Sequence, residues 1–196
     1  MNIINFSDKN IEQSFKLDSN QDYFLFCIGS GSAELVFDIA SNNIRSNIFG
    51  IVIGGTSSKI KLKTVVKHTE SDSSSWFHLK GLFFDDARLD FEGLIDIGEK
   101  ASGSDAYLKN DNLVLGDASI VNSSPQLEIK NQDVKASHGV TIKTIEEYES
   151  FYLKSRGLDK SLSNGLLIKG FVLDLIDKCT DPKVREFIIV GLNKYL

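Results

Sequence analysis

The side chains best suited to chemistry in this sequence are three histidines, His68, His78 and His138, and two cysteines, Cys27 and Cys179. The histidines lie far apart in the chain, so their spacing alone assembles no nucleophile, base and orienting acid. The cysteines form no CxxC pair and have no neighbouring histidine, which argues against a structural zinc site and a disulfide framework. We therefore expect two free, buried thiols.

One dense group of carboxylates, Asp85, Asp86, Asp90 and Glu92, raises the alternative of glycoside chemistry. Paired carboxyl groups on either side of a glycosidic bond are the usual machinery for its hydrolysis. Asp90 and Glu92 alternate with apolar residues, however, which puts both on the polar face of a strand. Charged residues on such a face are ordinarily only hydrated, so we expect no catalysis there.

His138 has the most distinctive context of the three histidines. It lies between a short apolar run and the C-terminal part of the chain, and Gly139 follows it. We expect a turn at this position. A turn histidine is commonly structural, but neutral imidazole is also the commonest protein metal ligand, so both interpretations stay open.

The elements that must position these residues are short strands as far as about residue 143. Apolar and polar residues alternate with a period of two, as in Leu89 and Phe91 against Asp90 and Glu92. Turns are expected between the strands, among them 110–112 and 123–125. The absence of intervening helical segments excludes a doubly wound α/β fold. A sandwich, a barrel and a β-solenoid stay open, because strand spacing fits more than one of them.

In one of these runs, residues 77–83, the apolar side chains share one face, and His78 and Lys80 are expected to face water on the other. The remainder of the chain, from 144, is predicted to be helical. Thr144 and Glu147 have the spacing of a capping box, and Asp181-Pro182 is a typical helix start. A second helix between these two carries an apolar stripe, which we expect to be buried: Leu162, Leu166, Phe171, Leu175 and Cys179. The division predicted is 1–143 for the β part and 144–196 for the helical part.

Composition excludes several classes of protein. The chain is 41% hydrophobic and 25% charged, which is ordinary for a globular protein. Its net charge is −5, whereas a nucleic-acid-binding protein typically carries an excess of basic residues. No apolar stretch approaches the ~20 residues needed to cross a bilayer, and residues 1–16 do not resemble a secretory signal. We expect a cytoplasmic protein without a nucleic-acid or membrane partner.

Several segments, in one unbroken order, resemble the SufB/SufD family of iron–sulfur cluster assembly scaffolds. The most specific lies at 133–141, where Ser137-His138-Gly139 is similar to the SufD form, and His68 also stands where the family tends to have a histidine. The other segments that carry the resemblance are 84–95, 105–115, 125–129, 151–157 and Gly170-Phe171. The resemblance implies a right-handed parallel β-helix followed by a C-terminal helical domain. It also implies that SufB-like and SufD-like chains pair through their β-helices and that the helical domains dock on a SufC-type ATPase.

On this resemblance the chain is identified as a SufD-like scaffold subunit and not an enzyme. His138 is then expected to be a ligand of iron or of a transient iron–sulfur cluster shared with the SufB-like partner, with no permanently bound cofactor. The contact with the ATPase is expected at four residues of the helical part: Tyr148, Phe151, Tyr152 and Arg156.

The sequence also departs from the family pattern. Residues 118–124 contain no cysteine where SufB has an essential one, and residue 136 is alanine where many SufD proteins have cysteine. Typical members are longer and begin with a helical domain, so this chain resembles a minimal core. A homodimeric SufBD-type scaffold is the first alternative. A β-solenoid carbohydrate-active enzyme and a plain interaction solenoid without a metal role are the others.

Overall fold

A computed structural model describes residues 1–196 as a two-sheet parallel β-solenoid followed by three helices. Successive strands alternate between the sheets, so odd-numbered strands form one and even-numbered strands the other. Sheet A contains β1 (Asn2–Asn5), β3 (Tyr23–Ile28), β5 (Arg45–Gly54), β7 (Ser74–Phe83), β9 (Asp105–Val114) and β11 (Lys135–Lys143). Sheet B contains β2 (Asn10–Leu17), β4 (Gly31–Ile39), β6 (Lys59–His68), β8 (Arg88–Ile97) and β10 (Ile120–Ile129).

Every strand pair in both sheets is parallel and in register, so like side chains stack in rows along the solenoid. The period-two pattern places one set of side chains between the sheets, where 27 buried residues form a continuous core. Phe77 and Phe91 stack across this interior with ring centroids 6.0 Å apart. The predicted mainly-β solenoid with C-terminal helices is confirmed.

The corners between strands are tight because residues in the left-handed backbone region turn the chain. Asp8, Asn43, Ser57, Asp72 and Asp85 all have positive φ, as do Gly29 and Gly103. Asparagine and aspartate tolerate this region better than other residues that carry a side chain, and glycine adopts it freely. The turn signals in the sequence thus mark the corners of the solenoid.

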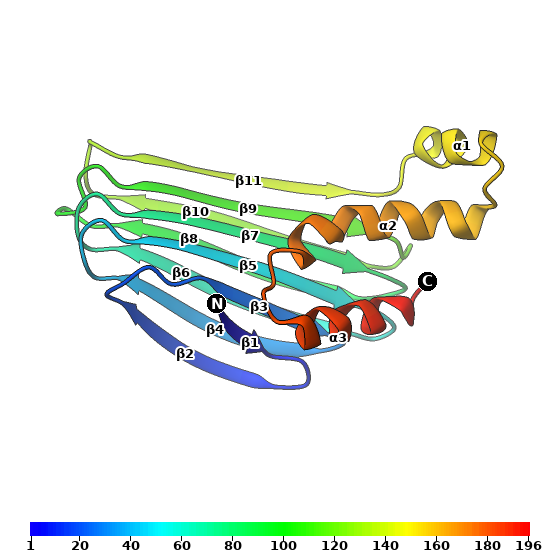
Figure 1. Ribbon diagram of the computed structural model, residues 1–196, viewed down its shortest axis with the longest axis horizontal. Coiled ribbons are helices and arrows are strands. Elements are labelled where there is room, and N and C mark those ends of the chain that lie inside the picture. Colours follow the sequence, from blue (N-terminus) through cyan, green and yellow to red (C-terminus); the bar gives the residue numbers. More distant parts are fainter.

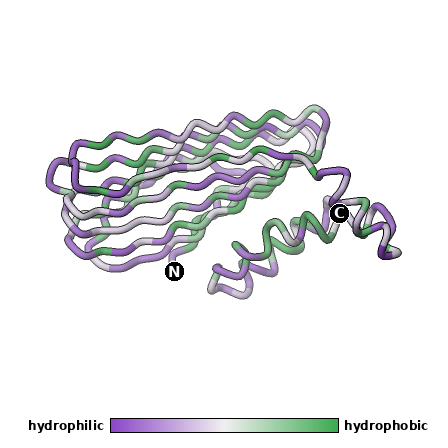
Figure 2. The backbone as a smooth tube through the Cα atoms, turned by 90° about the horizontal axis from the view of Figure 1, so that it is seen from above, coloured by the Kyte–Doolittle hydropathy of each residue, from purple (hydrophilic) through white to green (hydrophobic).

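Three helices follow the last strand: α1 (Glu147–Ser155), α2 (Lys160–Ile176) and α3 (Pro182–Asn193). The second and third lie along the outer face of sheet A (Figures 1 and 2). Their contact with the sheet forms a second core of 13 buried residues, among them Phe26, Ile51, Val172 and Ile188. The outer face of sheet B has no such cover and is lined by charged side chains such as Lys61 and Glu92.

Several local expectations are wrong. The segments 110–112 and 123–125 are not turns but lie inside β9 and β10. His138 is not in a turn either, since it lies within β11. His78 and Lys80 do alternate with the core residues of β7, but they are buried, because α2 covers that face of the sheet.

The helical details differ from the expectation in two places. Glu146 and Glu149, not Thr144 and Glu147, form the capping box of α1. In α2 the predicted stripe is buried only toward its C-terminal end, at Leu175 and Cys179, whereas Leu162 and Leu166 are more than half exposed. The buried residues of the helix are Ser163, Ile168, Val172, Leu175 and Ile176. Asp181 and Pro182 begin α3 as predicted. None of the three helices has the length and hydropathy that a bilayer-spanning helix requires.

Candidate functional site

The C-terminal end of the solenoid is open. The strand β11 is the last of sheet A and β10 the last of sheet B, so both lie at sheet edges, next to one another. An edge strand presents unpaired backbone N–H and C=O groups, which form a template for a further strand. Apolar side chains of the same two strands are exposed around this end: Ile120, Ile129, Val140 and Ile142. We call β10 and β11 together the terminal rung.

His138 lies in the middle of the terminal rung. Its register partner is Leu108 of β9, a residue of the solenoid core, so His138 lies in an inward-facing row. No further rung covers that row, and His138 is therefore exposed. The structure places the predicted ligand at the open end of the solenoid, among apolar residues, where a second chain could reach it.

No other ligand of this chain joins His138. No group of three or more His, Cys, Asp or Glu side chains is arranged to hold a metal ion. Burial raises the pKa of the Cys27 thiol to about 12 and also raises the pKa of Cys179. Both thiols belong to apolar cores, Cys27 inside the solenoid and Cys179 between the helices and sheet A.

A buried polar network directly below the terminal rung was not anticipated from the sequence. Asn112 Nδ2 donates to Asn110 Oδ1 at 2.7 Å, and the same oxygen accepts from Ser123 Oγ of β10 at 2.7 Å. Asn112 Nδ2 also lies 3.4 Å from the carbonyl of Thr141 in β11. The network thus ties both strands of the terminal rung to β9. In the sequence, the run of polar residues at 110–112 between apolar residues is the feature that indicates this network.

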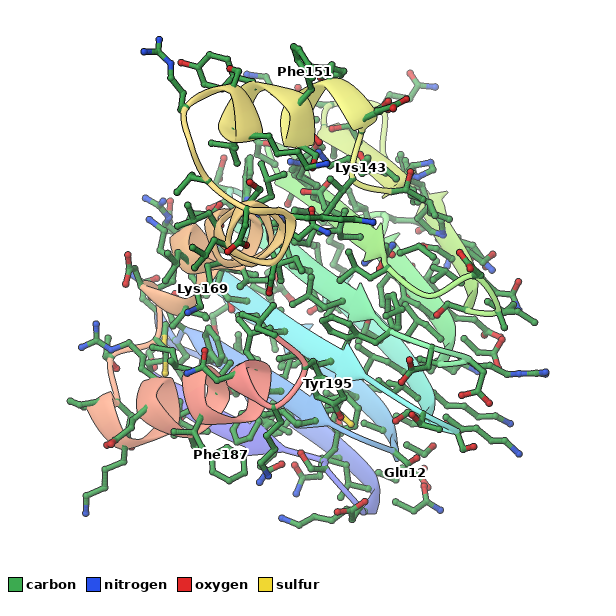
Figure 3. All side chains as sticks on the ribbon, turned by 90° about the vertical axis from the view of Figure 1, so that its right-hand side faces the viewer. Glu12, Lys143, Phe151, Lys169, Phe187 and Tyr195 are labelled. Atoms are coloured by element: carbon green, nitrogen blue, oxygen red, sulfur yellow. The ribbon has the colours of Figure 1, made fainter.

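The aromatic residues predicted to bind an ATPase form one exposed surface on α1. Tyr148, Phe151 and Tyr152 are 70%, 69% and 57% exposed, and Ser150 is the one buried residue of this helix. Arg156 lies over the Tyr152 ring, 5.5 Å from its centroid. In Figure 3, Phe151 points away from α2 and from the sheet. We call these four residues the α1 patch, and the structure brings all of them together.

The α1 patch connects closely to the terminal rung. The strand β11 ends at Lys143 and α1 begins at Glu147, so a short linker joins them. Lys143 Nζ lies 3.5 Å from Glu149 Oε1, which adds an ion pair between the end of the strand and the first turn of the helix. The end of the strand that carries His138 is thus tied to the first turn of α1.

The other candidate residues have structural partners. His68 is fully buried, with its ring nitrogens 2.7 Å from Ser73 Oγ and 2.8 Å from Ser75 Oγ. Burial lowers the pKa of His68 to about 4. Asp85 accepts from Thr56 Oγ1 and Asp86 from the Ser57 amide, so both carboxylates tie neighbouring corners together.

The remaining two carboxylates lie on the outer face of sheet B. Asp90 accepts from Asn122 Nδ2 at 2.8 Å, and the register places Lys61 beside Asp90 and Lys63 beside Glu92. Rows of alternating charge of this kind stabilise a hydrated sheet face. The four carboxylates thus serve two different parts of the fold and do not converge on one site.

Comparison with known proteins gives a family. Residues 1–171 match the family model described as the core domain of SufB and SufD proteins of the SUF system for FeS cluster assembly. The chain is 29% identical over 158 residues to the iron–sulfur cluster assembly protein SufD of Escherichia coli. It is 28% identical over 179 residues to an iron–sulfur cluster assembly SufBD family protein of Mycobacterium bovis.

These matches cover much of the chain but less than half of each relative. They include 74% and 87% of this chain, and 37% and 42% of the Escherichia coli and Mycobacterium proteins. A similar protein of Synechocystis is 38% identical over 92 residues, which is 20% of its length. The likeness therefore concerns the β-solenoid and the first part of the helical segment.

Proposed function

Because the chain belongs to the SufB/SufD core-domain family, we propose that it is a SufD-like scaffold subunit of an iron–sulfur cluster assembly complex. The observation that carries this proposal is His138 in the exposed inner row of the terminal rung. On this view the protein holds and orients a nascent cluster, and it performs no catalytic reaction itself.

The terminal rung is the proposed contact with a SufB-like chain. Two adjacent edge strands, each without an outer neighbour, can be continued by two edge strands of a partner. The exposed Ile129, Val140 and Ile142 side chains would be covered in the same step. Pairing at this end encloses His138 between the two chains, where a ligand from each can meet.

A single imidazole suits a transient site. Thiolates are the usual ligands of iron–sulfur clusters, and histidine replaces them in some. His138 would supply one such ligand, and the SufB-like chain would supply the sulfur ligands that this chain lacks at the terminal rung. A cluster shared in this way is cargo that leaves when the two chains separate or rearrange.

The α1 patch is the proposed contact with a SufC-like ATPase. Exposed aromatic side chains beside an arginine are the residues most often found at the energetic centre of protein interfaces. The helix follows β11 directly, so movement of the ATPase would be transmitted to the terminal rung.

The test is anaerobic cluster reconstitution with the SufB-like chain and the ATPase, with and without this protein. We expect cluster formation, followed by visible absorption and Mössbauer spectra, to be faster and more complete when this protein is present. An equal rate and yield without it would overturn the scaffold role.

A further inference from the structure

Beneath α2, the outer face of sheet A carries buried charged residues where the rest of the covered face is apolar. His78 and Lys80 of β7 and Asp111 of β9 are 9%, 8% and 7% exposed. Burying a charged group costs free energy unless another group pairs with it. Each of these side chains therefore needs a partner, and the partners come from α2 and from the sheet itself.

The partners of Lys80 lie on α2. Its Nζ donates to Asp174 Oδ1 at 2.6 Å and to the carbonyl oxygen of Phe171 at 2.7 Å. The same ammonium lies 5.0 Å from the centroid of the Phe171 ring. Asp174 is itself 60% exposed at its side chain, so water can replace Lys80 at that carboxylate. Lys80 is thus a polar link between the sheet and the helix.

A second carboxylate lies beside Lys80 on the sheet. Asp111 is the register partner of Lys80 in the neighbouring strand, on the same face. Its Oδ2 accepts from His78 Nε2 at 2.9 Å and from Lys109 Nζ at 2.8 Å. Burial alone would raise the pKa of Asp111, but the hydrogen bonds from Lys109 and His78 hold it below its usual value. Asp111 is therefore an ionised carboxylate about one strand spacing from the Lys80 backbone.

We propose that Lys80 is a two-position latch for helix α2. When α2 lies on sheet A, Lys80 binds Asp174 and the Phe171 carbonyl. When α2 lifts, Lys80 turns along its flexible stem to Asp111 and shares that carboxylate with Lys109. The alternative partner lowers the free energy of the lifted state, so α2 leaves the sheet more readily than a purely apolar contact would allow.

The latch also connects α2 to the terminal rung. Asp111 is in register with Thr141 of β11, so a rearrangement at Asp111 occurs next to the strand that contains His138. This inference goes beyond the proposed function and depends on no partner, because both positions of Lys80 lie within this chain.

The alternative is a fixed ion pair in which Asp111 only supports the surface that α2 covers. The two accounts predict opposite signs for Asp111→Asn. For a latch, loss of the second partner makes lifting rarer. For a fixed support, the same change weakens the surface and makes lifting more frequent.

The test is amide hydrogen exchange of the full chain, followed at Ile168–Ile176 of α2 with the strands of sheet A as internal reference. Asp174→Asn should increase exchange of the α2 amides about two- to fivefold, the range of a partly exposed ion pair. Asp111→Asn should decrease it by a similar factor. Asp177→Asn is the matched control, since Asp177 is the exposed C-cap residue of the helix and forms no ion pair.

A double variant keeps the test decisive if Asp111→Asn perturbs the sheet. In a Lys80→Met background the latch is absent, so adding Asp111→Asn should leave α2 exchange unchanged. Faster or unaltered exchange in Asp111→Asn alone would overturn the latch. An effect of Asp111→Asn that persists undiminished in the Lys80→Met background would overturn it as well.

Discussion

His138 is the register partner of Leu108 and ends a row whose four preceding members are buried. The row runs across sheet A through Tyr23, Ile48, Phe77 and Leu108, which are 0–2% exposed, and ends at His138 on the open face of β11. A position that repeats as a core position in four strands thus carries an imidazole in the fifth. The strand register fixes the place of this residue in the row, and the open end of the solenoid leaves its side chain exposed.

Replacing His138 by alanine should leave the fold intact and impair cluster assembly. The side chain is exposed and makes no ion pair, so we expect a change in the free energy of unfolding within about 0.5 kcal/mol. Cluster yield in the reconstituted complex should fall strongly. Ser137→Ala is the control, since Ser137 lies on the same strand with its side chain on the other face. If the His138→Ala complex assembles clusters at the wild-type yield, the histidine is not a cluster ligand and has only a structural role.

The sequence predicts the strands of sheet B well, because buried residues alternate there with more exposed ones. Two local expectations within the last two strands are wrong. The turn signal at 123–125 predicts a turn at Pro125, but proline is tolerated in an edge strand, where its missing N–H removes no necessary hydrogen bond. His138 was likewise placed in a turn because an exposed histidine beside glycine does not show that the strand pattern continues through it.

The sequence does not predict which side chains of sheet A the helices bury. Period-two alternation puts His78 and Lys80 in water, and only the tertiary position of α2 buries them. The same packing decides which side of α2 is buried. Leu162 and Leu166 look like core residues by type, yet Ile168 and Val172 face the sheet. The exposed α1 patch was predicted as a set of residues, and its role in binding stays a prediction.

Phe151→Ala and Tyr152→Ala should weaken binding of the SufC-like ATPase without destabilising the chain. Truncation of a central aromatic residue in an interface commonly costs ~2 kcal/mol or more, which is roughly a 30-fold weaker affinity. Calorimetry would measure it. Phe187→Ala is the control, because Phe187 is 52% exposed on α3, away from the patch. Equal loss with Phe187→Ala, or no loss with either patch variant, would place the contact elsewhere.

Helix α3 should unfold together with the solenoid, since its buried side chains share a core with sheet A. Removal of 144–196 would expose that core, so point variants are the better probe. Ile188 is fully buried, and Ile188→Ala should lower the free energy of unfolding by about 2–5 kcal/mol in a single transition. Val190→Ala, at a 53% exposed site on the same helix, should cost under about 0.5 kcal/mol. Equal effects of the two changes would show that α3 is not part of the core.

We expect the free energy of unfolding to decrease as the pH is lowered below about 6.5, because of His68. Burial lowers its folded-state pKa to about 4, while the unfolded chain has the ordinary value of about 6.5. Below pH 6.5 the unfolded chain binds a proton that the folded chain does not, so stability is complete above that pH and decreases toward pH 4. The decrease from this residue is about 3 kcal/mol. The free energy of unfolding of His68→Gln, measured by urea at several pH values, should depend less on pH between 6.5 and 4 than that of the wild type. An unchanged pH dependence in His68→Gln would mean that another group is responsible.

The most direct test of the account is pairing at the terminal rung, measured by sedimentation equilibrium of this protein mixed with a SufB-like chain. The wild type should form a one-to-one heterodimer, and Ile142→Asp should abolish it, because Ile142 is 51% exposed on the edge strand β11 and would be buried in the pair. Glu12→Lys, on the edge strand β2 at the opposite end of the solenoid, should pair like the wild type. Undiminished pairing of Ile142→Asp, or self-association of the wild type in preference to the heterodimer, would contradict the account.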